Sequence, residues 1–298
     1  MHARHFISRL AVFLFVIASL SGCGSKPVIG VLLPMSGDAC SYGESMKEAI
    51  DLALAEAEAD GSLPANLTVV WGDSATDPEK GREEIQRLAG QGADLIITGT
   101  TSGTARAFLQ ELEDSDVIAL SPSASAPSLT KDSKRFFRLF ASDELEGQRA
   151  GRFLFEDQNK TSVLIFSQDS EQARGIEPFF RQVYEGAMGG TVVGRVLVGD
   201  EHWHEECADL IAARQPESVY IIAYANKTLE VLRHLKQQGY TGTICATSAF
   251  YSGEVLEQEP ELVDGVFFPM PAFEIQSELE VSRTFVESFR AKFGHDPD

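Results

Sequence analysis

The chain has 298 residues, of which 43% are hydrophobic, and its 45 acidic and 25 basic side chains give a formal net charge of −20. This length exceeds what one typical core holds, so we expect two lobes. The negative charge argues against nucleic acid as a partner and against electrostatic capture by an anionic membrane. An aromatic content of 9% and the lack of low-complexity tracts predict a chain that is folded almost throughout.

The first residues have the features of an export signal. Two arginines precede an apolar run from Leu10 to Leu20, which has the length of a signal-peptide core and is short for a bilayer span. The segment Leu20-Ser21-Gly22-Cys23 is similar to a bacterial lipobox, whose cysteine carries the lipid. We expect a signal peptide at 1–22 and a lipid anchor with its tether at 23–27. The alternative is an ordinary signal peptide with an incidental cysteine.

Three further cysteines follow, namely Cys40, Cys207 and Cys245. An odd number leaves at least one unpaired in an oxidising compartment, and no C-x-x-C spacing indicates metal or redox chemistry. A disulfide between Cys207 and Cys245 remains open at this point, as does the role of Cys40.

Short β-rich runs alternate with amphipathic helical stretches along the first half of the chain. Val28 to Leu33 is an apolar run that ends at Pro34, and apolar residues at helical spacing follow it. Asp77 as N-cap and Pro78 at the first helical position predict another helix start. This alternation predicts a parallel sheet with helices on both faces. Further strands are expected at 67–71, 94–98 and 117–120.

The same alternation restarts after a polar stretch around Ser142. A pattern that begins again in this way predicts a second α/β lobe. Strands are expected at 162–166, 191–198, 219–223, 243–247 and 266–268.

Three stretches, each next to a predicted strand, carry a family resemblance. They are Gly30 to Gly37 with Tyr42, Thr100 to Gly103, and Ser121 to Thr130. Together they resemble the ligand loops of the branched-chain amino-acid (Leu/Ile/Val) binding proteins, an ABC-transporter substrate-binding family with the type I periplasmic binding fold.

The resemblance implies an α/β fold of two Rossmann-like lobes with parallel sheets, joined by crossovers, with a ligand held in the cleft between them. Lobe 1 would hold 28–141 and 269–298, and lobe 2 would hold 142–268. The family continues beyond the Pro297 region with a helix, a crossover and more of the second lobe, so we expect a chain truncated at its C-terminus.

Hydroxyl side chains follow two neighbouring predicted strands. Ligands of open α/β sheets lie beyond the carboxyl ends of the strands, and a helix N-terminus, here expected near Gly103, favours a carboxylate. Alternatively, these hydroxyls cap a helix and build a turn. The resemblance favours ligand binding, with Ser123 acting through its backbone and Ser125 through its side chain. The residues concerned are Thr101, Ser102, Ser123, Ala124 and Ser125.

Four more candidate residues rest on the resemblance alone. Tyr42 and Tyr224 match tyrosines that line the family's cleft, although each could be an ordinary, partly buried tyrosine. Gln172 stands where the family has a further tyrosine. Ser248 stands where the amino-acid binders have an acidic residue that pairs with the ligand's ammonium. A buried, unpaired ammonium is costly, so Ser248 weakens the expectation of a standard amino acid as ligand.

Two other patterns allow alternative interpretations. Phe250 and Tyr251 supply either an apolar wall of the cleft or packing beneath the hinge. The run from His202 to Cys207 contains imidazole, carboxylate and thiolate groups, which are metal ligands. However, Trp203 and Cys207 mark a buried helix face, which favours a solvated helix start over a metal site. We expect no metal and no cofactor.

The sequence contains no nucleophile elbow, phosphate loop or paired-carboxylate signature, so we expect no enzyme. We expect an exported lipoprotein, in the periplasm or on the cell surface, that is anchored to a bacterial membrane. It would capture a small polar solute, an amino acid or a related carboxylate or amide, and deliver it to ABC permease subunits. The alternatives are a regulator of a cell-wall synthase, similar to penicillin-binding protein activators, and a ligand-sensing receptor with the same fold.

Overall fold

The computed structural model describes residues 26–64, 66–251, 259–270, 273 and 275–297, so the expected signal peptide and Cys23 lie outside the described residues. Within these ranges, ten parallel strands form two five-stranded sheets. The first sheet has the order β2-β1-β3-β4-β5 and the second the order β10-β9-β8-β6-β7. Read from β7, the second sheet therefore repeats the strand order of the first. The strands are β1 (Val28–Leu33), β2 (Thr68–Asp73), β3 (Leu95–Thr98), β4 (Ile118–Ser121), β5 (Phe136–Arg138), β6 (Ser162–Gln168), β7 (Thr191–Val198), β8 (Ser218–Ile222), β9 (Thr243–Ala246) and β10 (Val266–Phe267).

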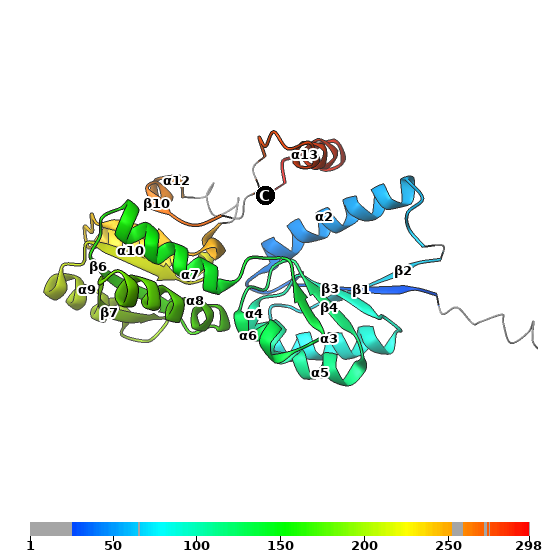
Figure 1. The fold of residues 1–298 in the computed structure, drawn as a ribbon, viewed down its shortest axis with the longest axis horizontal. Coiled ribbons are helices and arrows are strands. Elements are labelled where there is room, and N and C mark those ends of the chain that lie inside the picture. Colours follow the sequence, from blue (N-terminus) through cyan, green and yellow to red (C-terminus); the bar gives the residue numbers. More distant parts are fainter. Residues whose placement is uncertain (1–25, 65, 252–258, 271–272, 274, 298) are drawn as a thin grey trace, which may run out of the picture.

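Helices cover both sides of the first sheet (Figure 1). One side carries α2 (Cys40–Ala59), against which α13 (Glu280–Phe293) packs. The other side carries α3 (Pro78–Gly90), α4 (Ser102–Ala107), α5 (Leu109–Ser115) and α6 (Pro127–Asp132). Apolar side chains of α3, α4 and α5 pack with those of β3 and β4 in one buried core. Asp77 caps α3 as predicted, because its side chain accepts a hydrogen bond from the Lys80 N–H at 2.7 Å.

The second sheet is also enclosed on both faces, and every residue of its strand β8 is buried. One face packs against α7 (Asp143–Arg152) and α8 (Glu171–Arg181), which continue into the π-helical segments η1 (Phe153–Asp157) and η2 (Gln182–Ala187). The other face packs against α9 (Trp203–Arg214) and α10 (Ala225–Gln237). A 3-10 turn, η3 (Ser248–Phe250), and the short α12 (Pro260–Val263) lie near β9 and β10.

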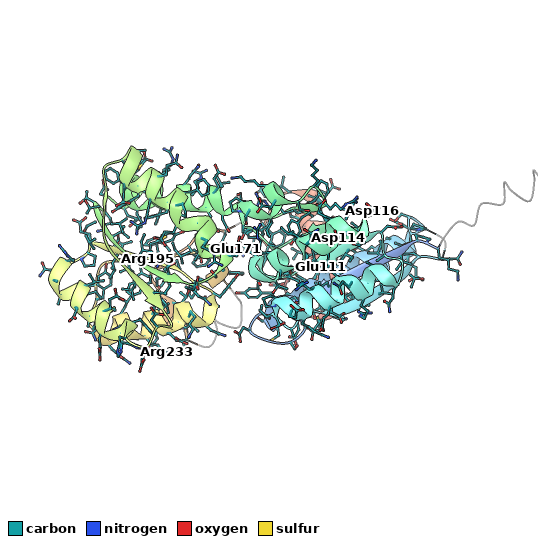
Figure 2. The ribbon with its side chains drawn as sticks, turned by 90° about the horizontal axis from the view of Figure 1, so that it is seen from below. Glu111, Asp114, Asp116, Glu171, Arg195 and Arg233 are labelled. Carbon is teal, nitrogen blue, oxygen red and sulfur yellow. The ribbon has the colours of Figure 1, made fainter. Side chains whose placement is uncertain are left out.

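The chain passes from the first sheet to the second between β5 and α7, and it returns to α2 with α13 after β10 (Figure 1). Glu171, at the start of α8, lies near the boundary between the two lobes (Figure 2). Its carboxylate accepts a hydrogen bond of 2.7 Å from the Ser128 hydroxyl of α6. The predicted α/β architecture of two parallel sheets is therefore confirmed.

Two local features differ from the sequence-based expectation. The three-residue strand β5 was not predicted as a strand, because it lies at the sheet edge and leaves Phe137 half exposed, so no apolar run marks it. The single helix expected after Thr101 is divided at Phe108 into α4 and α5. None of the described helices is long and apolar enough to span a bilayer.

Cys207 and Cys245 are both free and buried on opposite faces of the second sheet. Cys207 packs in the core formed with α9 and α10, whereas Cys245 packs in the core formed with α7 and α8. The sheet separates the two thiols, so the disulfide that the sequence left open is not formed. Burial raises the pKa of the Cys207 thiol to about 12 and also raises that of Cys245.

Candidate functional site

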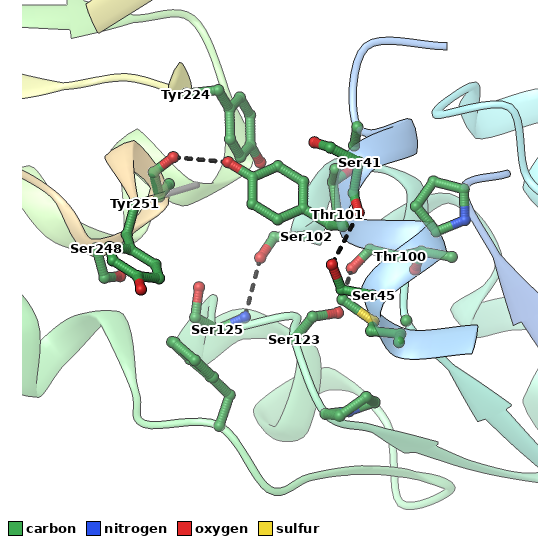
Figure 3. A pocket seen from close by; sticks show the side chains of 18 of the residues that line it. Ser41, Ser45, Thr100, Thr101, Ser102, Ser123, Ser125, Tyr224, Ser248 and Tyr251 are labelled. Carbon is green, nitrogen blue, oxygen red and sulfur yellow. Dashed lines mark hydrogen bonds between the residues drawn. The ribbon is translucent and has the colours of Figure 1, made fainter. Parts of the chain in front are cut away.

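A cavity of about 360 Å³ lies between the two lobes (Figure 3). Hydroxyl groups and aromatic rings dominate its wall, and no Asp, Glu, Lys, Arg or His of the described ranges lines it. The first lobe contributes Pro34, Ala39, Ser41, Tyr42, Ser45, Met46, Gly99, Thr100, Thr101, Ser102, Pro122, Ser123, Ser125 and Phe140, and later segments contribute Gln172, Tyr224, Ser248, Ala249, Tyr251, Met270, Phe273, Ile275 and Pro297.

The strand order explains why these residues meet. In each sheet the first strand in the sequence lies between the second strand on one side and the third on the other. The loops that follow the first and third strands therefore diverge at the carboxyl edge of the sheet. Tyr42 and Thr101 follow β1 and β3 at this point of the first sheet. Gln172 and Tyr224 follow β6 and β8 at the equivalent point of the second. The cavity thus lies where both switch points face each other.

The loop after β1 is held in place by Asp73 at the end of β2. The Asp73 carboxylate accepts from the N–H groups of Met35 and Ala75 and from the Ser36 hydroxyl, at 2.9, 2.7 and 2.7 Å. Partial burial acts to raise the pKa of Asp73, but these hydrogen bonds outweigh it and hold the pKa below its usual value. Gly43 lets α2 cross this loop closely, because a Cβ there would lie 2.2 Å from the Pro34 carbonyl oxygen. Tyr42 is thereby fixed at the cavity.

Ser102 joins the loops that follow β3 and β4. Its hydroxyl oxygen accepts a hydrogen bond from the Ser125 N–H at 3.1 Å (Figure 3) and another from the Ala126 N–H at 3.2 Å. The Ser123 hydroxyl donates to the Thr100 carbonyl at 2.9 Å. These contacts make the two loops one rigid wall of the cavity.

The structure places two features of this wall differently from the sequence-based expectation. Ala124 does not line the cavity: it is buried in the core beneath it, and its N–H donates to the Ser121 hydroxyl. The helix after Thr101 has only six residues, and the Thr101 hydroxyl accepts from the Thr104 N–H at its start. A helix this short contributes little dipole, so hydroxyl groups are the main polar feature of this wall.

The second lobe presents Gln172, Tyr224 and Ser248. Gln172 is 6% exposed, and its amide has no hydrogen-bond partner among the residues the structure describes. The Gln168 side chain accepts from the Tyr224 N–H at 3.1 Å and so holds the start of α10. Burial raises the pKa of Tyr224, and a hydrogen bond with Thr101 across the cleft acts in the opposite direction.

Ser248 is held by Glu146 of α7. The Glu146 carboxylate accepts from the Ser248 N–H at 2.8 Å and from the Ser248 hydroxyl at 2.7 Å. Burial raises the pKa of Glu146, while these two bonds partly offset that effect. Position 248 has no acidic side chain, but the carboxylate of Glu146 is hydrogen-bonded directly to Ser248, behind the cavity wall.

Asp143 is a second buried acid of α7, one turn before Glu146. It has no solvent-accessible surface, and neither carboxylate oxygen has a donor in hydrogen-bonding geometry among the described residues. Burial raises the pKa of Asp143 to about 7; the nearby Ser125 hydroxyl lowers it and Glu146 raises it further. The helix that follows the crossover between the lobes thus begins with a buried carboxyl group that readily takes a proton.

Eight of the nine residues predicted from the sequence surround this one cavity, and Ala124 lies behind its wall. Tyr251 lines the cavity, as one alternative expected, whereas Phe250 is buried in the core of the second lobe against the Phe268 ring. The prediction missed Ser41, Ser45 and Met46, although their helical spacing around Tyr42 was a signal for them. The run from His202 begins α9 with both histidines exposed, and no metal-binding cluster occurs among the described residues.

Known proteins are similar to this chain over most of its length. The family described as Periplasmic binding protein matches residues 27–298. The leucine-, isoleucine-, valine-, threonine- and alanine-binding protein of Pseudomonas aeruginosa is 24% identical over 297 residues, which cover 98% of this chain and 78% of that protein.

Two solved structures share the fold. The leucine-binding protein LivK of Thermotoga maritima superposes with a TM-score of 0.82 at 23% identity, covering 91% of this chain and 77% of that one. A solute-binding protein of an ABC transporter from R. palustris, in complex with benzoate, superposes with a TM-score of 0.77 at 20% identity, covering 91% and 75%.

Two parallel α/β lobes around an interlobe cavity define the class of two-lobed binding proteins. This chain belongs to the periplasmic binding protein family. Within it, the chain is similar to the branched-chain amino-acid binding proteins, as its loop sequences predicted.

Proposed function

We propose that this protein is an extracytoplasmic solute receptor that captures a small polar molecule between its lobes. The cavity of about 360 Å³, lined by both lobes and rich in hydroxyl groups, is the observation that carries this proposal. Its volume lies within the range of small-molecule sites. A solute that touches both walls stabilises only the closed arrangement, so binding and closure are coupled.

The solute class that fits this wall is an amino acid or a related carboxylate or amide. Hydroxyl groups on the first lobe supply donors for an acidic or amide oxygen, and Tyr42, Tyr224 and Tyr251 supply rings for an apolar part. The names of the relatives support this range, since one is a binding protein for five amino acids and another was solved with benzoate.

Native mass spectrometry of the purified full-length chain tests solute capture directly, because a retained molecule adds its mass to the protein. Calorimetry with amino acids, their deaminated counterparts and benzoate then measures affinity. Small-angle scattering should show a more compact particle with the bound solute than without it. Absence of a retained molecule, of binding and of compaction would contradict the proposal.

Export and anchoring form a second part of the proposal, and they rest on the sequence before residue 26. The basic and apolar start of the chain supports a signal peptide, and Leu20-Ser21-Gly22-Cys23 supports lipidation of Cys23. Cys23→Ser should abolish incorporation of labelled palmitate and release the protein from the membrane fraction. Cys40→Ser is the matched control and should change neither.

Delivery to ABC permease subunits completes the proposed function, and kinship with substrate-binding proteins of ABC transporters supports it. Deletion of the gene should abolish high-affinity uptake of the solute found by mass spectrometry, and the intact gene should restore it. Unchanged uptake, together with co-purification of a cell-wall synthase or a sensor kinase, would favour the regulatory or sensory alternatives.

A further inference from the structure

Glu146 is the acidic group placed best to act on a solute in the cavity. It is 8% exposed, and both of its carboxylate oxygens accept hydrogen bonds from Ser248, one from the backbone and one from the hydroxyl. No Lys, Arg or His of the described ranges pairs with it. A buried carboxylate without a cation is unstable unless a positive or donor group approaches it.

Ser248 lies between Glu146 and the cavity, because it lines the cavity and bonds to Glu146. A hydroxyl group has one hydrogen to donate and two lone pairs to accept with. The hydrogen of Ser248 is directed to Glu146 at 2.7 Å, so the oxygen offers only lone pairs to the cavity that it lines. A neighbouring carboxylate also polarises this oxygen and strengthens it as an acceptor.

The opposite wall has the reverse polarity. Ser102 uses its oxygen to accept two backbone N–H groups, so the hydroxyl hydrogen remains available as a donor toward the cavity. Asp143, one turn before Glu146 on α7, adds a second buried acid on the side of the second lobe. The cavity therefore has a donor end at Ser102 and an acceptor end at Ser248, and no charged side chain of the described residues lies between them.

We propose that Glu146 is a specificity-determining residue that positions Ser248 and supplies the counter-charge for a protonated amine of the solute. The amine would donate to the Ser248 hydroxyl oxygen, while an acceptor group of the same solute, such as a carboxylate, would face Ser102. The proposal rests on the solute-binding function proposed above. Glu146 of α7 would thus provide the negative charge that the serine at position 248 cannot provide.

The test uses matched pairs of solutes and matched variants of the full-length chain. Each L-amino acid of a panel is paired with the carboxylate that lacks only the amino group, for example L-leucine with 4-methylpentanoate, and benzoate is added. Calorimetry measures every affinity for the wild type, Glu146→Gln and Glu144→Gln. Glu144 lies two residues away on the same helix and outside the cavity wall, so it controls for the loss of one negative charge.

For at least one pair, we expect the wild type to bind the amino acid about tenfold or more tightly than the carboxylate without the amino group. Hydrogen bonds with charged groups have this magnitude. Glu146→Gln should remove most of this preference, and Glu144→Gln should keep it. An equal or tighter affinity of the wild type for the deaminated members, or a preference unchanged in Glu146→Gln, would overturn the role of Glu146 while solute binding stands. If nothing in the panel binds, the inference is overturned, and the proposed function is contradicted with it only if native mass spectrometry also finds no retained molecule. If Glu146→Gln fails to fold, Ser248→Ala takes its place, because it removes the hydroxyl through which Glu146 acts and should likewise remove most of the preference.

Discussion

The Tyr42 hydroxyl of the first lobe donates a hydrogen bond of 2.9 Å to the Ala249 carbonyl of the second lobe, across the cavity that both residues line. The two residues are 207 positions apart in the sequence. Their contact depends on the approach of the lobes, so it contributes to the arrangement that encloses a solute and not to the folding of either lobe alone.

Tyr42→Phe should therefore weaken solute binding while it leaves stability nearly unchanged. The variant keeps the ring and loses the neutral hydrogen bond to the Ala249 carbonyl, for which we expect about two- to tenfold lower affinity by calorimetry. Tyr240→Phe is the matched control, because the Tyr240 hydroxyl donates to the Pro216 carbonyl within the second lobe. Equal affinities of the two variants would show that the contact does not contribute to closure.

Ser102→Ala should reduce stability as well as affinity. The substitution leaves the N–H groups of Ser125 and Ala126 without their acceptor in a buried loop, which costs on the order of 1–3 kcal/mol of unfolding free energy. Urea unfolding measures this loss. Ser115→Ala removes a hydroxyl that bonds back to the Glu111 carbonyl on α5, and this control should change stability by less than about 0.5 kcal/mol.

The buried Asp143 makes stability depend on pH. Its pKa is raised from 3.8 to about 7 in the folded chain, mainly by burial, so unfolding releases a proton between these values. The unfolding free energy of the wild type should therefore fall as the pH rises from about 4 to about 7, relative to Asp143→Asn, by up to about 4 kcal/mol. The pKa of Glu146 is also raised, but Glu146 is present in both proteins and therefore contributes to both pH profiles. Denaturant titrations at several pH values check this, and parallel pH profiles would contradict it.

The parts of the fold that the sequence predicted are those encoded locally. Val28 to Leu33 is an apolar run closed by Pro34, and Asp77-Pro78 is a local helix start, so both elements were found where the structure has them. The hydroxyl-rich loops after β3 and β4 were singled out mainly by the family resemblance, and the structure places both at the cavity. The roles of the individual side chains in solute binding stay predictions.

The partner of Ser248 could not be predicted in this way. Glu146 lies 102 residues earlier, in the first turn of a helix where acidic residues are common, and only the packing of α7 beside η3 brings the two together. The same holds for the edge strand β5, whose three residues have no periodic pattern. Contacts between elements distant in the sequence decide both features.

Gly43→Ala should damage the site through the backbone. The added Cβ would lie 2.2 Å from the Pro34 carbonyl oxygen and 2.7 Å from its carbon, and backbone atoms cannot move aside as a flexible side chain can. We expect a loss of about 2 kcal/mol or more in unfolding free energy and weaker solute binding, because the start of α2 also carries Tyr42.

Gly90→Ala, at the end of α3, is the matched control for this substitution. A Cβ at Gly90 would meet no atom within 4 Å, and the residue has no positive φ, so alanine should be neutral or stabilise the chain by up to about 1 kcal/mol. Thermal and denaturant unfolding of both variants, with calorimetry of the solute, provide the comparison. If Gly43→Ala matched Gly90→Ala in stability and affinity, the close crossing of α2 over the β1 loop would not be what fixes Tyr42 at the cavity.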